Sequence, residues 1–124
     1  MTKQLKVLIV DDDQDLLYLL KKKLYKSDIA CVTATQPSEG LDKANNQNPD
    51  LVLLDLNLPK MSGLGFLREF KHRPKLSDIP IVVLTSLADE EVCQEAMNLG
   101  AAAYLTKDCS DNELLTVIDR FANH

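Results

Sequence analysis

The 124-residue sequence lacks any long apolar stretch, and this absence limits where the protein can reside. Its apolar runs are only a few residues long, whereas a helix that crosses a bilayer needs roughly 20. Residues 1–6 are too few, and contain no apolar core, for a signal peptide. We therefore expect a cytoplasmic protein that makes no membrane contact.

Cysteine and histidine are also scarce, and neither shows the spacing of a metal site. Cys31, Cys93 and Cys109 are an odd number without metal-ligand spacing, which is typical of free thiols in a reducing cytosol. His72 and His124 stand far apart in the sequence. The sequence therefore offers no disulfide framework and no metal site built on thiolates or imidazoles.

The sequence has fewer basic than acidic residues, 14 against 19, so its net charge is −5. This balance argues against direct nucleic-acid binding by the domain. The apolar and charged fractions, 45% and 27%, are typical of globular proteins. With no repeat, low-complexity tract or linker, residues 1–124 are predicted to form one domain with a sizeable core.

Five short apolar segments are predicted to be strands. Leu51–Leu54 is a continuous apolar run that follows Pro49, and it ends on Asp55. Such a run is typical of a strand buried on both faces of a parallel sheet. The other predicted strands are Lys6–Val10, Ile29–Ala34 (the less apolar of these, expected at an edge), Ile79–Thr85 and Ala101–Leu105.

Helical patterns separate these strands. Asp13 is predicted to cap the first helix, Gly100 to terminate the fourth, and Ser110 with Glu113 to form a capping box before the fifth. Gly40 lowers the helix propensity of the second. The predicted ranges are Asp15 to about Lys26, Pro37 to about Gln47, Leu64 to about Arg73, Asp89–Leu99, and Asp111 to about Phe121.

Strict alternation of strands and helices predicts a parallel sheet with right-handed crossovers and helices on both faces. We expect an α/β fold of the flavodoxin-like, doubly wound type. Its five strands are predicted in the order 2-1-3-4-5, with five helices.

Polar residues follow several predicted strands at what would be the same edge of this sheet: Asp11 and Asp12, Asp55, Thr85 and Lys107. Like charges that converge there repel by about 1 kcal/mol per pair in water, and more in a drier site. A divalent cation such as Mg²⁺ would offset this repulsion, and a lysine and a hydroxyl suit phosphoryl oxygens. The residues therefore predict a metal-assisted phosphoryl-transfer site with a carboxylate nucleophile.

Blander interpretations exist for the same residues. Asp55 alone could be an ordinary turn residue, and Asp11 and Asp12 could merely place negative charge at a helix N-terminus. Tyr104 could simply pack.

Four segments together resemble receiver domains of two-component response regulators. They are Val7–Asp13 (VLIVDDD), Leu53–Gly63 (LLDLNLPKMSG), Leu84–Ser86 (LTS) and Tyr104–Lys107 (YLTK). The likeness covers nearly the whole chain in the order and spacing of that family. It implies a phosphoacceptor module that is not an enzyme beyond self-phosphorylation from small donors and autodephosphorylation.

The resemblance assigns a role to each residue of the site. Asp55 would accept a phosphoryl group from the phosphohistidine of a partner. Asp12, Asp55 and the backbone carbonyl of Asn57 would bind Mg²⁺, for which Mn²⁺ can substitute. Asp11 would assist directly or through water.

The remaining residues would respond to phosphorylation. Lys107 would pair with Asp55 and then with a phosphoryl oxygen, while Thr85 would shift toward another. Tyr104 would rotate inward, coupled to that shift. The output face would comprise the fourth helix, fifth strand and fifth helix.

The implied partners are a sensor histidine kinase or phosphotransfer protein, and an unidentified downstream protein or output domain. The domain would be a monomer or a phosphorylation-dependent dimer.

The sequence departs from the family pattern after Lys107. Asp108 replaces the usual proline, and because a cis bond before a non-proline residue costs about 2.5–4 kcal/mol, a trans bond is expected. Leu87 and Asn57 occupy positions that tune dephosphorylation in the family, and the apolar Leu87 suggests a phosphoryl group that is not especially short-lived.

Two other classes of function use related chemistry. A hydrolase of the haloacid-dehalogenase type also forms an aspartyl phosphate beside Mg²⁺, but Asp11–Asp15 lacks the Thr or Val of that family's motif. A flavodoxin-like FMN binder would need a Ser/Thr/Gly-rich phosphate loop after Val10, and none follows.

Overall fold

The structure, a computed structural model, describes residues 4–56, 63–86 and 90–122. Within these residues five strands alternate with five helices, and the strands form one parallel sheet in the order β2-β1-β3-β4-β5. This is the flavodoxin-like α/β fold predicted from the alternation. The strands are β1 (Lys6–Val10), β2 (Ala30–Ala34), β3 (Leu51–Leu54), β4 (Ile81–Thr85) and β5 (Ala103–Thr106).

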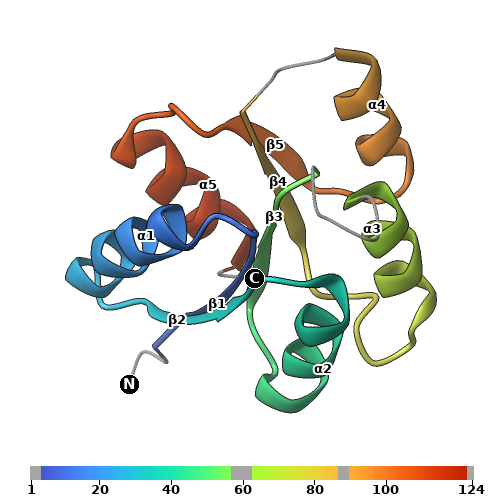
Figure 1. Ribbon diagram of the computed structural model, residues 1–124, viewed down its shortest axis with the longest axis horizontal. Coiled ribbons are helices and arrows are strands. Elements are labelled where there is room, and N and C mark those ends of the chain that lie inside the picture. The colour runs from blue at the N-terminus through green and yellow to red at the C-terminus, as the bar shows by residue number, and fades with distance from the viewer. Residues whose placement is uncertain (1–3, 57–62, 87–89, 123–124) are drawn as a thin grey trace.

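The helices cover both faces of the sheet (Figure 1). On one face lie α1 (Gln14–Lys26) and α5 (Asp111–Ala122), and on the other lie α2 (Pro37–Gln47), α3 (Gly63–His72) and α4 (Glu90–Asn98). In the described part of the chain, no helix has the length and apolar character that crossing a membrane requires.

Side chains of the central strands point alternately into two apolar cores. In β1, Val7 and Ile9 pack on the α1–α5 side, whereas Leu8 and Val10 pack on the side of α2 and α3. All four residues of β3 are fully buried. Burial on both faces explains why the sequence of β3 is a continuous apolar run rather than an alternating one.

Helix α1 begins one residue earlier than predicted because Asp13 is its N-cap. The Asp13 carboxylate accepts hydrogen bonds from the backbone N–H groups of Asp15 and Leu16, at 3.1 and 3.2 Å. These bonds satisfy two donors that the first turn of a helix leaves unpaired. The cap fixes the chain immediately after Asp11 and Asp12.

Strands β4 and β5 begin two residues later than predicted. Ile79 donates its N–H to Leu76 O in a turn, at 3.0 Å, so the apolar run enters the sheet only at Ile81. Ala101 donates its N–H back to Ala96 O, which closes the C-terminal end of α4 around Gly100. Gly100 has a φ of 110°, which favours glycine and agrees with its predicted capping role.

Two glycines are required by close packing near the central strands. A Cβ at Gly40 in α2 would lie 3.0 Å from Val10 Cγ2 and 3.1 Å from Phe66 Cε2. A Cβ at Gly63 would lie 2.3 Å from Leu56 Cα and 2.7 Å from Asp55 O. Gly63 also donates its N–H to Leu56 O at 2.9 Å, so α3 starts directly against the end of β3.

Because a Cβ at Gly63 would meet backbone atoms and a Cβ at Gly40 would meet only side-chain atoms, we expect Gly63→Ala to destabilise the protein more than Gly40→Ala. The new methyl at residue 63 would overlap backbone atoms that cannot yield without moving β3, which we expect to lower the free energy of unfolding by about 1–3 kcal/mol. The methyl at residue 40 meets side-chain atoms that can shift, and α2 gains helix propensity. Urea denaturation of both variants measures the order, and equal losses would contradict it.

Candidate functional site

The site lies at the carboxyl edge of the sheet, where backbone hydrogen bonds continue beyond the ends of two strands. Asp11 follows β1 and donates its N–H to Ala34 O at 3.0 Å. Asp55 follows β3 and donates its N–H to Val10 O, also at 3.0 Å. Because both residues extend the ladder, the sheet itself fixes the origin of both side chains.

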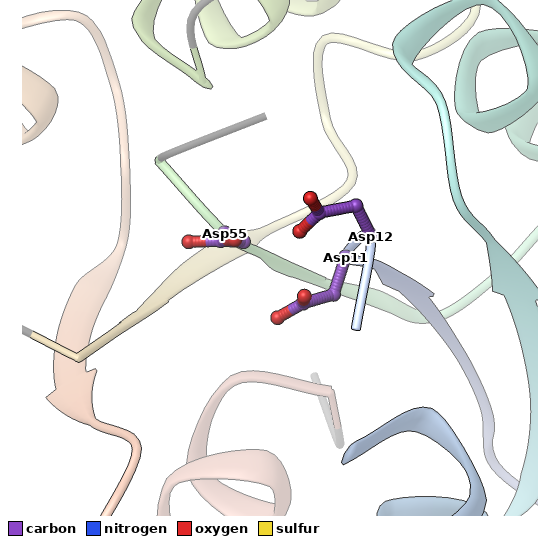
Figure 2. A group of neighbouring side chains, drawn as sticks. All are labelled: Asp11, Asp12 and Asp55. Atoms are coloured by element: carbon purple, nitrogen blue, oxygen red, sulfur yellow. The ribbon is translucent and has the colours of Figure 1, made fainter. Parts of the chain in front are cut away.

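Three carboxylates gather at this edge, as predicted (Figure 2). Carboxylate oxygens of Asp11, Asp12 and Asp55 lie within 4.8 Å of one another. Asp11 and Asp55 are only 2% and 3% exposed, whereas Asp12 is exposed. Figure 2 shows the three side chains grouped where β1 and β3 end.

Lys107, which follows β5, reaches two of these carboxylates. Its Nζ lies 2.9 Å from Asp11 Oδ2 and 3.4 Å from Asp55 Oδ2. Burial alone would lower the pKa of the Lys107 ammonium, but the contacts with Asp11 and Asp55 outweigh burial and raise it. Lys107 is therefore a cation that partly neutralises the cluster.

The prediction that Lys107 pairs with Asp55 is confirmed, but its shorter contact is with Asp11. Asp11 also accepts a hydrogen bond through Oδ1 from the Asp13 N–H at 2.9 Å. Burial nonetheless raises the pKa of the Asp11 carboxyl, against the lowering effects of that bond and of Lys107, and the Asp55 charge raises it further. An additional cation beside Asp11 would therefore stabilise the charged form of this buried carboxylate.

Thr85, at the end of β4, is 3% exposed and is joined to Lys107 through the backbone. The Lys107 N–H donates to Thr85 O at 2.8 Å. A tight turn follows, in which Cys109 donates its N–H to Thr106 O at 3.0 Å. No cis peptide bond occurs in the described residues, so the Lys107–Asp108 bond is trans, as expected from the absence of proline.

Tyr104 does not point into the core. It pairs with Val83 in the sheet register and is 43% exposed. It lines a cleft of about 600 Å³ together with Glu90, Glu91 and Glu95 of α4. The Tyr104 ring, for which the family resemblance implies an inward rotation, therefore faces outward in this structure.

The donor set suits a hard divalent cation. Carboxylate oxygens are the ligands that Mg²⁺ prefers, and two ligands of one Mg²⁺ ion lie at most about 4.2 Å apart. Because the oxygens of the three carboxylates lie within 4.8 Å of one another, binding one ion needs only a small contraction of the cluster. Asn57, whose carbonyl was predicted as a further ligand, and Leu87 lie outside the described residues.

Sequence reasoning missed the role of Gly63. Its close approach to Asp55 O and Leu56 Cα places the start of α3 directly against the end of β3. A glycine at the end of the LLDLNLPKMSG segment was visible, but only packing reveals why a side chain is excluded.

Comparison with known proteins supports the same interpretation of the site. Residues 7–119 match the family described as response regulator receiver domain. The DNA-binding transcriptional regulator NtrC of Klebsiella pneumoniae is 31% identical over 116 residues, which cover 94% of this chain and 24% of that protein. The chain spans between about a quarter and under half of the length of the curated relatives it matches.

Solved structures of receiver domains share this fold. A receiver domain protein (CheY-like) from Methanospirillum hungatei is 31% identical with a TM-score of 0.88, and the match covers 98% of this chain and 95% of that one. The BeF3-activated N-terminal receiver domain of Klebsiella pneumoniae RstA is 28% identical with a TM-score of 0.89, covering 96% of this chain and 99% of that one. Neither alternative class of function, hydrolase or FMN binder, is supported by these matches.

The raised pKa of Asp11 predicts that lowering the pH stabilises the metal-free site. Its folded-state pKa lies above the ordinary 3.8, so the folded protein binds the proton more tightly than the unfolded chain does. The contribution of Asp11 to stability should therefore rise as the pH falls from above the folded pKa toward 3.8.

The comparison of wild type with Asp11→Asn isolates this contribution from that of other carboxyl groups. At pH 7 in EDTA, Asp11→Asn should be more stable by on the order of 1 kcal/mol, and the difference should shrink as the pH falls. Asp12→Asn, at an exposed position, is the matched control and should change stability little. A less stable Asp11→Asn variant in urea titrations would contradict the prediction.

Proposed function

The chain belongs to the response regulator receiver domain family, and we propose that residues 1–124 form one such domain that is switched by phosphorylation of Asp55. Receiver domains are phosphoacceptors of two-component systems, and this chain is a phosphoacceptor module rather than a catalytic enzyme. The observation that carries the assignment to Asp55 is its position beside two further carboxylates and the Lys107 ammonium.

Asp55 acts as the nucleophile. A carboxylate oxygen attacks the phosphorus of a phosphohistidine, so an O–P bond forms as the donor's N–P bond breaks, and the imidazole leaves with a proton from solvent. The product is an acyl phosphate on Asp55. Lys107, 3.4 Å from Asp55 Oδ2 before reaction, then pairs with a phosphoryl oxygen.

Asp11, Asp12 and Asp55 hold Mg²⁺ in this proposal, with the backbone carbonyl of Asn57, and Mn²⁺ can substitute. The bound cation supplies positive charge that offsets the phosphoryl oxygens. Mg²⁺ bound by Asp11, directly or through water, would compete with Lys107 for the carboxylate that it now contacts at 2.9 Å. Release from Asp11 makes Lys107 available to the phosphoryl group.

Thr85 and Tyr104 transmit the change to the surface. The acyl phosphate adds charge and acceptor oxygens where one carboxylate stood. Thr85 moves so that its hydroxyl donates a hydrogen bond to one of these oxygens. Tyr104, which is exposed on the neighbouring strand before phosphorylation, then turns inward into the space that Thr85 leaves. The face formed by α4, β5 and α5 is the output surface.

The partners follow from this role. A sensor histidine kinase or phosphotransfer protein supplies the phosphoryl group, in the cytoplasm, and a downstream protein or an output domain reads the result. The domain itself binds no nucleic acid directly, consistent with its net charge of −5. It acts as a monomer or as a phosphorylation-dependent dimer.

Incubation with acetyl phosphate and Mg²⁺ should add one phosphoryl group to the wild-type protein. Asp55→Asn should abolish the addition, because the amide is not a nucleophile, and EDTA should abolish it in wild type. Lys107→Ala should slow the addition by about tenfold or more, since it removes charge stabilisation. Intact-protein mass spectrometry measures the addition, and labelling of Asp55→Asn to the wild-type extent would contradict the proposal.

Beryllofluoride with Mg²⁺ should reduce the exposure of Tyr104 in the wild-type protein. A fluorine label at the meta position of tyrosine reports this as a change in the ¹⁹F NMR signal of residue 104. The signals of Tyr18 and Tyr25 serve as internal controls. Thr85→Ala should bind beryllofluoride but leave the Tyr104 signal unchanged, and an identical shift in that variant would contradict the coupling.

A further inference from the structure

Strand β2 forms one end of the sheet, so within the described part of the chain one of its edges has no neighbouring strand (Figure 1). It pairs with β1 alone, in a parallel register that sets Val32 beside Leu8. A free edge presents backbone N–H and C=O groups to which a further strand can bond, and natural proteins block such edges. The free edge of β2 therefore needs protection if the domain is to stay monomeric.

Hydrogen bonds toward β1 show which residues of β2 face outward. The Ala30 N–H and the Ala34 carbonyl bond to the residues that flank β1, at 2.8 and 3.0 Å. The N–H and C=O of one residue point to the same side of a strand, and successive residues alternate between the two sides. Cys31 and Thr33 therefore direct their backbone groups to the free edge.

Two side chains of α2 occupy part of this edge. Lys43 donates a hydrogen bond from Nζ to the Thr33 carbonyl. Glu39 Oε1 accepts a hydrogen bond at 2.8 Å from the N–H of Thr35, just beyond the end of β2. Lys43 Nζ also lies 3.4 Å from Glu39 Oε2. The two side chains, which we call the Glu39–Lys43 pair, thus bind one acceptor and one donor of the backbone as well as each other.

The Glu39–Lys43 pair is charged at neutral pH. The hydrogen bond from the Thr35 N–H lowers the pKa of the Glu39 carboxyl, against a smaller opposite effect of burial, and the Lys43 charge lowers it further. Charged side chains, lysine above all, protect edge strands because an incoming strand would have to strip them of water. The pair therefore raises the free energy of adding a strand to β2.

We propose that the Glu39–Lys43 pair blocks a self-complementary surface on β2, and that without the pair β2 binds antiparallel to β2 of a second copy of the chain. A two-fold axis at Val32 places Cys31 of one copy opposite Thr33 of the other. Residues that face each other in this way exchange both of their backbone hydrogen bonds. The Thr33 carbonyl, which this pairing requires, is the group that Lys43 occupies.

This association would be independent of phosphorylation. Thr85 and Tyr104, the proposed switch residues, lie on β4 and β5, whereas β2 is at the opposite end of the sheet. The Glu39–Lys43 pair would therefore keep this edge closed before and after reaction at Asp55. A phosphorylation-dependent dimer would have to form through another surface.

The first measurement uses the wild-type protein without a phosphoryl donor. Amide hydrogen exchange followed by NMR should find lower protection factors for Cys31 and Thr33 than for Val32, whose N–H faces β1. Equal protection of the three amides would show that another part of the molecule covers the edge, and would overturn the inference.

The second measurement compares the self-association of variants. Glu39→Ala with Lys43→Ala removes both contacts to the strand and keeps the helix propensity of α2 high. The control, Asp42→Ala with Asn46→Ala, changes two exposed positions of the same helix. A further protein adds Thr33→Pro to the Glu39/Lys43 variant, which removes an outward N–H without breaking a bond to β1. Circular dichroism checks that each protein is folded.

Sedimentation equilibrium should find wild type and the control monomeric. The Glu39/Lys43 variant should dimerise with a Kd at least about tenfold lower than that of wild type. In the dimer the amides of Cys31 and Thr33 should gain protection from exchange, and the added Thr33→Pro should restore the monomer.

Three results would overturn the inference: a monomeric Glu39/Lys43 variant, an equal gain of association in the control, or a dimer that Thr33→Pro leaves intact. None of these measurements uses acetyl phosphate. Failure of acetyl phosphate to label Asp55 would therefore overturn the proposed function and leave this inference standing.

Discussion

Repulsion between carboxylates at one edge of the sheet is the constraint on which the rest of this structure depends. Asp11 and Asp55 are almost completely buried with their oxygens close together, and Asp12 stands beside them. Such a cluster exists only because β1 and β3 are neighbours whose ladder continues through both aspartates. Lys107 offsets part of the repulsion between these carboxylates. A bound cation or a phosphoryl group would therefore add to a site at which charged side chains already interact.

Lys107 links the carboxylates of this edge to strands β4 and β5. Its ammonium contacts carboxylates from two strands, while its N–H is bonded to the carbonyl of Thr85. Thr85 lies opposite Thr106 in the register, and Tyr104 lies opposite Val83. A displacement of the lysine is thus mechanically linked to the two strands that carry the predicted switch residues. Because the residues of β3 and β4 are buried and tightly packed, we expect the domain to change between discrete arrangements rather than to deform gradually.

Much of this could be predicted from the sequence, because apolar runs and polar strand ends follow directly from a buried parallel sheet. The order of the strands, the capping by Asp13 and the convergence of Asp11, Asp12 and Asp55 are all local patterns combined with one topological rule. The preference of Lys107 for Asp11 over Asp55 was not predictable, since it depends on differences of half an ångström between side chains. Nor could sequence alone show which aspartate is buried, or that Gly63 touches the backbone after β3.

The distribution of aromatic residues has a spectroscopic consequence. The sequence contains no tryptophan, and its three tyrosines are the exposed residues Tyr18, Tyr25 and Tyr104. The fully buried aromatic side chains, Phe66 and Phe70, are phenylalanines, which contribute almost no emission beside tyrosine. The intrinsic fluorescence of this domain therefore originates from α1 and β5 alone. It reports on the exposed faces of these two elements and carries almost no information about the core.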